Sequence, residues 1–192
     1  PQIAAITERA MAGELDFAEA LKVRVALLAG LDADMIQQCL RERVRPMPGA
    51  EILLRTMTAW GAHAVLVSGG FTSFTSPVAD MLGFAEVHAN VLEIQNGRLT
   101  GALAADIVDA ATKRQVLRSA AGTLGLDLQS ALAVGDGAND MPMIAEAVSS
   151  GGLGVGYRPR PHLAAVANFS VRHNDLTALL FAQGIKADAW IH

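Results

Sequence analysis

The segment Ala131-Leu-Ala-Val-Gly-Asp-Gly-Ala-Asn-Asp140 decides the fold class of this chain. It begins with four apolar residues and continues with two acids, an amide and two glycines. A short apolar run of this kind is typical of a parallel strand that is covered on both faces. Ligands of open parallel sheets bind beyond the carboxyl ends of the strands, where glycine lets them approach the backbone. Asp136 is therefore placed to bind a hard cation through oxygen, as Mg²⁺ prefers.

Asp136 and Asp140 also have a purely structural interpretation, in which they cap the helix that follows, as acids at a helix start often do. The complete pattern Val134-Gly-Asp-Gly-Ala-Asn-Asp140 after a buried strand is more specific than either acid alone, and it favours a functional loop. An EF-hand is excluded, because its loop requires acids or amides at alternate positions and a glycine at the sixth.

Helices alternate with apolar runs along the rest of the chain, which is the pattern of an α/β fold. Further extended segments are predicted at 64–67, 152–157 and 169–171, and helices at 50–60, 74–82, 113–124, 141–148 and 176–183. Asn96-Gly97 predicts a two-residue hairpin turn within 87–99. We therefore expect an α/β core with a Rossmann-like, mainly parallel sheet flanked by helices.

Residues 1–45 are predicted to form a small helical cap domain, ahead of the α/β core at 46–192. Their apolar residues fall at helical spacing with interruptions at glycine, which predicts three short helices. Asp16 is the predicted N-cap of the second helix and Asp32 that of the third, because helix-forming residues follow each of them.

Composition excludes several classes of protein. Of the 192 residues, 52% are hydrophobic and 18% charged, which is typical of a folded globular chain and not of a disordered one. The formal net charge of -4 and the lack of a Lys/Arg run argue against a nucleic-acid partner. No apolar stretch approaches the roughly 20 residues of a membrane helix, so we expect no membrane partner and a cytoplasmic location. The single cysteine, Cys39, fits a reducing compartment and is predicted to be a buried helical thiol.

Two further segments carry groups that can bind phosphate. In Val65-Leu-Val-Ser-Gly-Gly70 the Ser68 hydroxyl and the backbone N–H groups after it can donate to phosphate oxygens, although such a turn alone is more often structural. Lys113 opens a predicted helix, where its ammonium can neutralise phosphate charge, although a lone lysine there is more often solvated. The occurrence of both beside the acidic loop favours phosphate binding.

Six separated segments resemble the phosphoserine phosphatases of the haloacid dehalogenase superfamily. They are Met11-Ala-Gly-Glu-Leu-Asp-Phe17, Arg24-Val-Ala-Leu-Leu28, Leu66-Val-Ser-Gly-Gly-Phe-Thr72, Ala89-Asn-Val-Leu-Glu93, Gly97-Arg-Leu-Thr-Gly101 and Ala133-Val-Gly-Asp-Gly-Ala-Asn-Asp140. The resemblance implies a Mg²⁺-dependent hydrolase that converts O-phospho-L-serine to L-serine and phosphate, the last step of serine biosynthesis. The implied partner is this small molecule, and a homodimer stays open.

The resemblance also implies roles for residues of the predicted core. Ser68 and Gly69 are similar to the phosphate-binding pair, and Lys113 to the lysine that pairs with the phosphate and the nucleophile. The acidic loop resembles the one that binds magnesium and substrate. In that loop, Asp136 corresponds to a metal ligand and Asn139 to a residue that contacts the substrate. Asp140 corresponds to an acid that supports these residues without being a metal ligand itself.

In the predicted cap, the resemblance implies residues that recognise the serine part of the substrate. Arg24 is similar to the cation that binds the substrate carboxylate, and a planar guanidinium suits that task because it forms two parallel hydrogen bonds. Met11 and Phe17 resemble the apolar walls of the closed site, which would exclude water.

The nucleophile expected from the resemblance is missing from the sequence. These enzymes form an aspartyl-phosphate, which requires a carboxylate nucleophile and a second acid two residues later. The family carries both in an Asp-x-Asp motif after the first strand, upstream of the cap. The only Asp-x-Asp here is Asp32-Ala-Asp34, which follows no buried strand and is interpreted as a helix cap.

We therefore expect the nucleophile segment to lie outside these 192 residues, upstream of Pro1, and the chain alone to be inactive and to bind Mg²⁺ weakly or not at all. Three other functions stay open: a different phosphatase of the superfamily, a phosphotransferase, or a non-catalytic fragment that binds phosphate or metal. Arg24 is the main feature that favours phosphoserine among the substrates.

Overall fold

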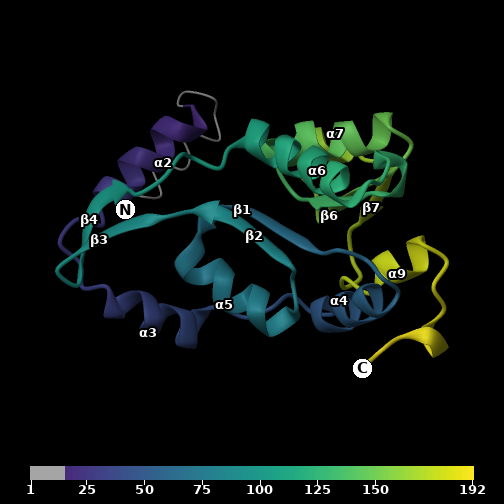
Figure 1. Cartoon of the computed structure of the whole chain (residues 1–192), viewed down its shortest axis with the longest axis horizontal. Helices are drawn as coiled ribbons and strands as arrows, with labels where there is room; N and C mark the ends of the chain where they lie inside the picture. The colour runs from purple at the N-terminus through teal and green to yellow at the C-terminus, as the bar shows by residue number, and fades with distance from the viewer. Residues whose placement is uncertain (1–15) are drawn as a thin grey trace. The chain divides into compact units, whose positions relative to one another are not determined.

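The computed structural model describes residues 16–192, which form two compact units (Figure 1). The first unit contains the described residues up to Val44 together with Ser68–Pro77 and His88–Asp109. The second contains Arg45–Val67, Val78–Val87 and Ala110–His192. One boundary between the units thus falls between Val44 and Arg45. That residues 1–45 form a separate cap domain stays a prediction.

Three elements run from one unit into the other: β1 (Val65–Phe71), α5 (Thr72–Leu82) and β2 (Glu86–Asn90). β1 and β2 are paired in a two-stranded sheet. The strand was predicted to end before Ser68, but β1 continues through Ser68, Gly69 and Gly70 to Phe71. The prediction of a turn at these residues is therefore wrong, because the pairing with β2 keeps the glycines extended.

The first unit is built from two helices and a hairpin. The helices are α2 (Phe17–Ala26) and α3 (Asp34–Arg43), and the hairpin consists of β3 (Leu92–Gln95) and β4 (Arg98–Leu103). The two strands are antiparallel, and the turn residues Asn96 and Gly97 have φ of 51° and 75°. These positive values are those of the hairpin turn that Asn-Gly favours, so the predicted hairpin is confirmed.

Local polar contacts fix where the two helices begin. Asp16 is the N-cap of α2, as predicted, and its carboxylate accepts a hydrogen bond from the N–H of Ala18 at 3.0 Å. For α3 the N-cap is Ala33, so the prediction of Asp32 is wrong by one residue. The Asp32 carboxylate still accepts from the N–H of Asp34 at 2.9 Å, which satisfies one free donor of the helix start.

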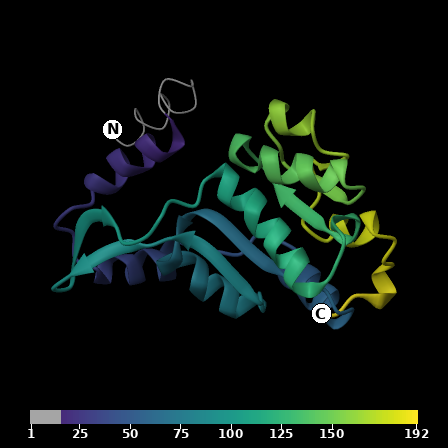
Figure 2. The same ribbon diagram turned by 45° about the horizontal axis from the view of Figure 1, so that its top comes forward.

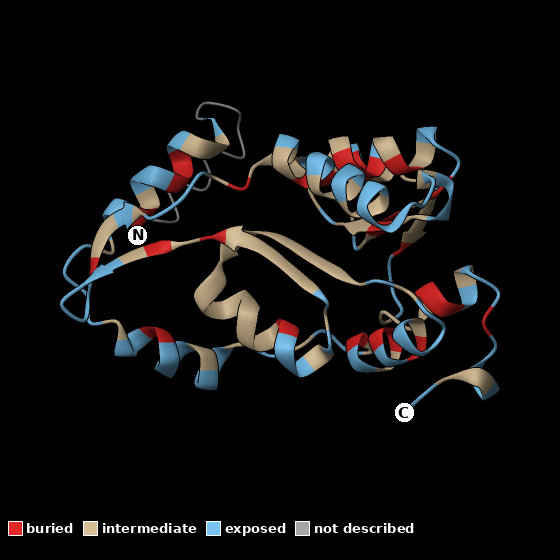
Figure 3. Ribbon diagram, viewed as in Figure 1, coloured by how far each residue is buried: buried red, intermediate tan, exposed pale blue. Residues whose placement is uncertain are grey.

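The core of the first unit joins α2 and α3 to the hairpin, and its buried residues are Leu21, Val25, Ile36, Leu92 and Leu99. α2 packs against β4 (Figures 1 and 2). α3 contributes only one of these side chains and is otherwise largely exposed (Figure 3). Its Cys39 is helical as predicted but exposed, so the prediction of a buried thiol is wrong.

The second unit contains a parallel sheet of three strands in the order β5–β6–β7, which confirms the predicted mainly parallel α/β core. The strands are β5 (Leu132–Gly135), β6 (Leu153–Tyr157) and β7 (Phe169–Val171). In the register Val134 lies opposite Val155, which lies opposite Phe169.

Helices cover both faces of this sheet (Figures 1 and 2). On one face α7 (Met141–Ser149) packs on β5 and β6 and α6 (Ala110–Leu124) packs on α7. Buried residues there include Ala133, Met143, Ile144, Ala147 and Leu163. The other face is covered by α4 (Ala50–Ala59) and α9 (Ala178–Ala182), and its buried residues are Leu53, Leu54, Val155, Val171, Leu179, Leu180 and Ile185. No helix within residues 16–192 is long and apolar enough to cross a membrane.

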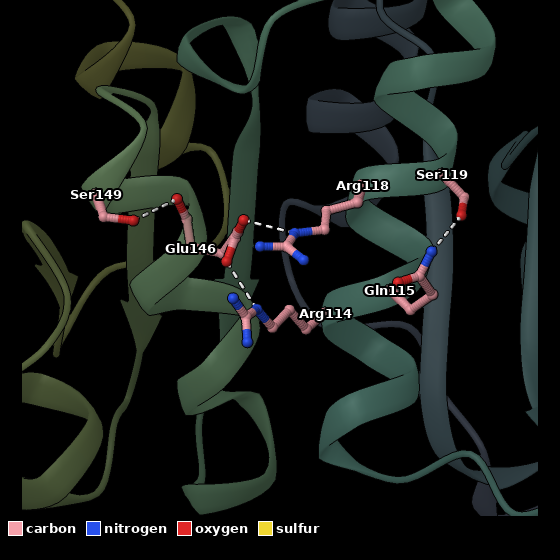
Figure 4. Close-up of polar contacts among 6 residues, drawn as sticks. All are labelled: Arg114, Gln115, Arg118, Ser119, Glu146 and Ser149. Carbon is pink, nitrogen blue, oxygen red and sulfur yellow. Dashed lines mark hydrogen bonds and ion pairs between the residues drawn. The ribbon is translucent and has the colours of Figure 1, made fainter.

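Glu146 ties α6 to α7 (Figure 4). Its two carboxylate oxygens accept hydrogen bonds from Nε of Arg118 at 2.6 Å and Nε of Arg114 at 2.7 Å. These bonds, Arg118 first, hold the pKa of the Glu146 carboxyl below its usual value. A carboxyl with a lowered folded-state pKa stabilises the fold above its unfolded pKa of about 4.3, and this stabilisation is lost as the pH falls through the folded pKa.

We expect Glu146→Gln to lower the melting temperature at pH 7, because both arginines lose the charge that they share. Glu51→Gln is the matched control, since Glu51 forms an exposed i,i+4 pair with Arg55 and should cost less. The difference between the two variants should shrink as the pH falls through the lowered folded-state pKa of Glu146, where the wild-type carboxylate becomes protonated. Thermal unfolding followed by circular dichroism at several pH values measures the melting temperatures of both variants. Equal melting temperatures of Glu146→Gln and Glu51→Gln at pH 7 would contradict the role of Glu146.

Candidate functional site

In the first unit, Ser68 lies in the middle of β1. Its Oγ accepts a hydrogen bond from the N–H of Gly70 at 3.0 Å. A hydroxyl that accepts at one lone pair keeps its proton for another acceptor. The Ser68 hydroxyl proton is therefore left for a further acceptor, and Ser68 would donate it from a strand and not from a turn.

Asn90, at the end of β2, contacts the same segment and was assigned no role from the sequence. Its side chain is 1% exposed, its Nδ2 donates to the carbonyl oxygen of Gly69 at 2.9 Å, and its Oδ1 accepts from the N–H of Val108 at 2.9 Å. The available signal was an amide directly after the run Val87-His-Ala89, at the carboxyl end of a strand. Which backbone groups it binds depends on long-range packing.

In the second unit, Lys113 and Asp140 form a buried ion pair. Lys113 lies in the first turn of α6 and is 6% exposed, and its Nζ is 2.6 Å from Oδ1 of Asp140, which is 4% exposed. The other oxygen, Oδ2, accepts from the N–H groups of Asp136 at 3.0 Å and Gly137 at 3.2 Å. The interpretation of Lys113 as a solvated surface residue is thus wrong.

Asp140 takes part in the local structure of its loop and in an ion pair with a distant residue. Its Oδ2 accepts from the N–H of Gly137 and so closes the short 3₁₀ turn Ala138–Asp140. Asp140 is the N-cap residue of α7, as the structural interpretation predicts, but its side chain makes no capping hydrogen bond to that helix. It also holds the ammonium of Lys113, which the sequence did not predict because 27 residues separate the pair. The acid therefore connects the loop after β5 to the start of α6.

Gly135 makes this arrangement possible. A Cβ at Gly135 would lie 2.5 Å from Cγ and 2.7 Å from Oδ2 of Asp140. The carboxylate of Asp140 therefore occupies the space that any side chain at position 135 would need. The glycine before Asp136 is therefore needed for Asp140 to fold back.

The side chains of Asp136 and Asn139 differ from that of Asp140 in that they are not bonded to other residues of the loop. Within residues 16–192, neither the carboxylate of Asp136 nor the amide of Asn139 has a hydrogen-bond or ion-pair partner, and Asp136 is exposed. The Asp136 carbonyl oxygen accepts from the N–H of Arg160 at 2.9 Å, which anchors the loop to the residues after β6. Two polar side chains after the carboxyl end of β5 are thus available to a ligand.

The donor chemistry of the loop fits Mg²⁺, which binds carboxylate oxygen and usually keeps several water ligands. Among the described residues no group of three His, Cys, Asp or Glu side chains can hold a metal. Asp136 is therefore the protein ligand that this loop can offer, and further ligands would come from water, from a phosphate group or from a second acidic segment.

Arg24 and Phe17, two further predicted residues, belong to the first unit. Arg24 lies in the last turn of α2, where its Nε donates to the carbonyl oxygen of Ala20 at 3.2 Å. Phe17 packs against the core of that unit and is partly buried. Met11 lies outside the described residues. The structure thus places Arg24, Phe17 and Ser68 in the first unit, and Lys113 and the acidic loop in the second.

A shallow hollow of the second unit contains none of the predicted residues. It is lined by α6, by residues 126–129 and by Ser150. Residues 126–129 precede β5, whereas Asp136 follows it. The hollow therefore lies at the amino end of the strand, away from the carboxyl ends where parallel sheets bind ligands.

Comparison with known sequences shows which family shares these features. A model of the haloacid dehalogenase-like hydrolase family matches residues 1–145. The phosphoserine phosphatase of Streptomyces coelicolor is 42% identical over 187 residues, which are 97% of this chain and 44% of that protein. The phosphoserine phosphatase of Albidiferax ferrireducens is 44% identical over 184 residues, or 93% of this chain and 76% of that protein. The chain thus spans less than half the length of the first of these relatives.

Solved structures agree with this assignment and confirm the predicted fold. An unliganded probable phosphoserine phosphatase from Vibrio cholerae superposes with a TM-score of 0.86 and 36% identity, over 97% of this chain and 56% of that one. A phospho-aspartyl intermediate analogue of phosphoserine phosphatase gives a TM-score of 0.84 and 31% identity, over 96% and 85% of the two chains. The chain belongs to the haloacid dehalogenase-like hydrolase family, among its phosphoserine phosphatases.

Proposed function

We propose that the chain acts in the Mg²⁺-dependent hydrolysis of O-phospho-L-serine to L-serine and phosphate. The observation that carries this proposal is the buried Lys113–Asp140 pair next to the free carboxylate of Asp136. A fixed ammonium and an available carboxylate are what a phosphoryl-transfer site needs to neutralise charge and to hold a cation. Relatives named phosphoserine phosphatase, at 42% and 44% identity, support the choice of substrate.

Lys113 and Ser68 are proposed to bind the phosphoryl group. The Lys113 ammonium has three donors, and Asp140 takes one of them, so two are left for a phosphate oxygen and a nucleophile carboxylate. Ser68 would add a neutral donor through its hydroxyl proton, and Gly69 a backbone N–H. Because Asp140, which is itself held by two backbone N–H groups, already fixes the ammonium, its charge would need no reorganisation during the reaction.

Asp136 is proposed to hold Mg²⁺, which when bound would neutralise charge on the phosphoryl oxygens. Asn139, whose amide has no partner among the described residues, would contact the substrate beside it. Asp140 would keep Lys113 and the loop in place without contacting the reacting atoms, because its oxygens are already occupied.

The reaction also requires a nucleophile, and the Asp32-Ala-Asp34 segment is a poor candidate. The Asp32 carboxylate is bonded to the start of α3, and both acids are exposed. We propose that an Asp-x-Asp segment outside these 192 residues supplies the nucleophile and the general acid. The first Asp would attack phosphorus while the second protonates the serine oxygen, and the second would then activate the water that hydrolyses the aspartyl-phosphate.

Substrate selection is proposed to rest on the first unit. Arg24 would bind the carboxylate of phosphoserine, and Phe17 and Met11 would shield the reacting groups from water. Another phosphatase of the family or a phosphotransferase is the second candidate, because the phosphate-binding residues alone do not select the alcohol.

We expect the 192-residue chain to release no phosphate from O-phospho-L-serine with Mg²⁺. The protein extended upstream through an Asp-x-Asp segment should hydrolyse this substrate. A chelator should abolish the activity of the extended protein. Colourimetric phosphate release measures both. Turnover by the 192-residue chain would refute the proposed external nucleophile, whereas an inactive extended protein would refute the phosphatase function and leave a binding fragment.

Asp136→Asn in the extended protein should raise the Mg²⁺ concentration for half-maximal rate by about tenfold or more, because one of few charged ligands is lost. Asp127→Asn is the control, since Asp127 is an exposed acid at the amino end of β5.

A further inference from the structure

The side chain of Asn90 is buried and bonded on both sides to backbone groups. Its Nδ2 donates to the carbonyl oxygen of Gly69, and its Oδ1 accepts from the N–H of Val108, each at 2.9 Å. A carbonyl can only accept and a backbone N–H can only donate, so these two partners allow a single orientation of the amide. With 1% exposure, no water competes for either bond.

The peptide that Asn90 holds lies in β1, which is paired with β2, but its own two residues add no side-chain restraint. It joins Gly69 to Gly70, and neither residue has a Cβ that limits its backbone dihedrals. The peptide is trans and planar, so the carbonyl of Gly69 and the N–H of Gly70 point in opposite directions from one rigid plate. Asn90 binds the carbonyl side, and the N–H side binds Oγ of Ser68 at 3.0 Å.

We propose that Asn90 is a positioning residue for Ser68, acting through the peptide between Gly69 and Gly70. By fixing that peptide, Asn90 fixes the N–H that occupies a lone pair of the Ser68 hydroxyl. The hydroxyl proton is then directed to an external acceptor, which is the phosphate of the proposed function, on which this inference rests.

The molecule contains a matched control in Asn168. Its Oδ1 accepts from the N–H of Gly154 at 2.9 Å and its Nδ2 donates to the carbonyl oxygen of Gly152 at 3.1 Å. The bonds are of the same two kinds and also hold a glycine segment, but they lie at the start of β6, where no site residue is proposed. Loss of Asn168 therefore reports the structural effect of such a bridge alone.

The first test needs no ligand. In Asn90→Leu the hydrogen exchange of the Gly70 amide, measured by ¹⁵N NMR, should become about tenfold faster, since one hydrogen bond no longer fixes its peptide. Asn168→Leu should leave this rate unchanged. If Asn90→Leu does not fold, Asn90→Asp serves instead, because its ionised carboxylate still accepts from Val108 but donates nothing to Gly69.

The second test uses inorganic phosphate, titrated calorimetrically. Asn90→Leu should weaken its binding about tenfold, and Ser68→Ala should weaken it by a similar factor. In the Ser68→Ala background, Asn90→Leu should then change the affinity by less than about twofold, because its effect passes through the missing hydroxyl. Asn168→Leu should keep the wild-type affinity.

The outcomes separate the two proposals. Independent, multiplying effects of Asn90→Leu and Ser68→Ala on phosphate affinity would overturn the positioning role. If the wild-type chain binds no phosphate, the proposed function of Ser68 fails. The exchange rate of the Gly70 amide then still tests whether Asn90 fixes the peptide between Gly69 and Gly70. An unchanged exchange rate at Gly70 in Asn90→Leu would overturn the inference in either case.

Discussion

Lys113→Met is expected to lower the free energy of unfolding by about 3 kcal/mol, because it leaves the buried carboxylate of Asp140 without its cation. Removing one partner of a buried ion pair costs about 3–5 kcal/mol, since the remaining charge keeps its desolvation penalty and loses the attraction. The lower end applies here because Asp140 retains the hydrogen bonds from Asp136 and Gly137. Urea denaturation of both proteins measures the difference.

Arg55→Ala is the matched control for this variant. Arg55 and Glu51 form an ion pair at the same distance of 2.6 Å, but their side chains are 50% and 59% exposed. Solvent screens such a pair, so its loss should cost no more than about 0.5 kcal/mol. Similar costs for the two variants would show that burial of the Lys113–Asp140 pair has no energetic consequence.

Lys113→Met also tests the proposed role of Lys113 in the reaction. If Lys113 neutralises the phosphoryl group, Lys113→Met in the catalytically complete protein should lower kcat by about 10²–10³, the range for loss of one preorganised charge-stabilising group. Phosphate-release kinetics at a temperature where the variant is folded measure this. A folded variant with kcat within about twofold of wild type would remove Lys113 from the reaction and leave it as half of a structural ion pair.

Gly135→Ala is expected to cost about 3 kcal/mol through a steric conflict with Asp140. The added methyl would lie 2.5 Å from Cγ of Asp140, whose carboxylate is held by Lys113 and two backbone N–H groups and cannot move without breaking them. Overpacking a well-packed site costs about 1–3 kcal/mol, and the broken bonds place this change at the upper end. Urea denaturation again measures the loss.

Gly122→Ala makes the same chemical change with the opposite expected sign. Gly122 lies inside α6, and a Cβ there would meet no atom within 4 Å. Alanine is the better helix former, so this variant should be about 0.5–1 kcal/mol more stable than wild type. If Gly135→Ala were also neutral or stabilising, Asp140 would not be fixed against the glycine as described.

Features that depend on neighbours in the sequence could be predicted. The apolar run before Gly135 gave β5, and Asn96-Gly97 gave the β3–β4 turn, because strand burial and turn dihedrals are encoded within a few residues. The available carboxylate of Asp136 followed from the same run, since residues at the carboxyl end of a parallel strand face the ligand side of the sheet.

Features that depend on distant segments could not be predicted. Lys113 is buried because an acid 27 residues away folds back over a glycine, and nothing local to Lys113 indicates this. Ser68 lies in a strand because β2 pairs with β1, although Ser-Gly-Gly alone favours a turn. Cys39 is exposed because α3 buries only Ile36, whereas its apolar flanking residues suggested a covered face.

The exposure of Cys39 has a practical consequence for measuring the separation of the two units in solution. It is the single cysteine of the chain, so a maleimide dye attaches there without any engineered mutation. Cys39 belongs to the first unit, and both tryptophans, Trp60 and Trp190, belong to the second. Resonance energy transfer from the tryptophans to the dye therefore measures the separation of the units in solution. The measurement can be made with and without phosphoserine.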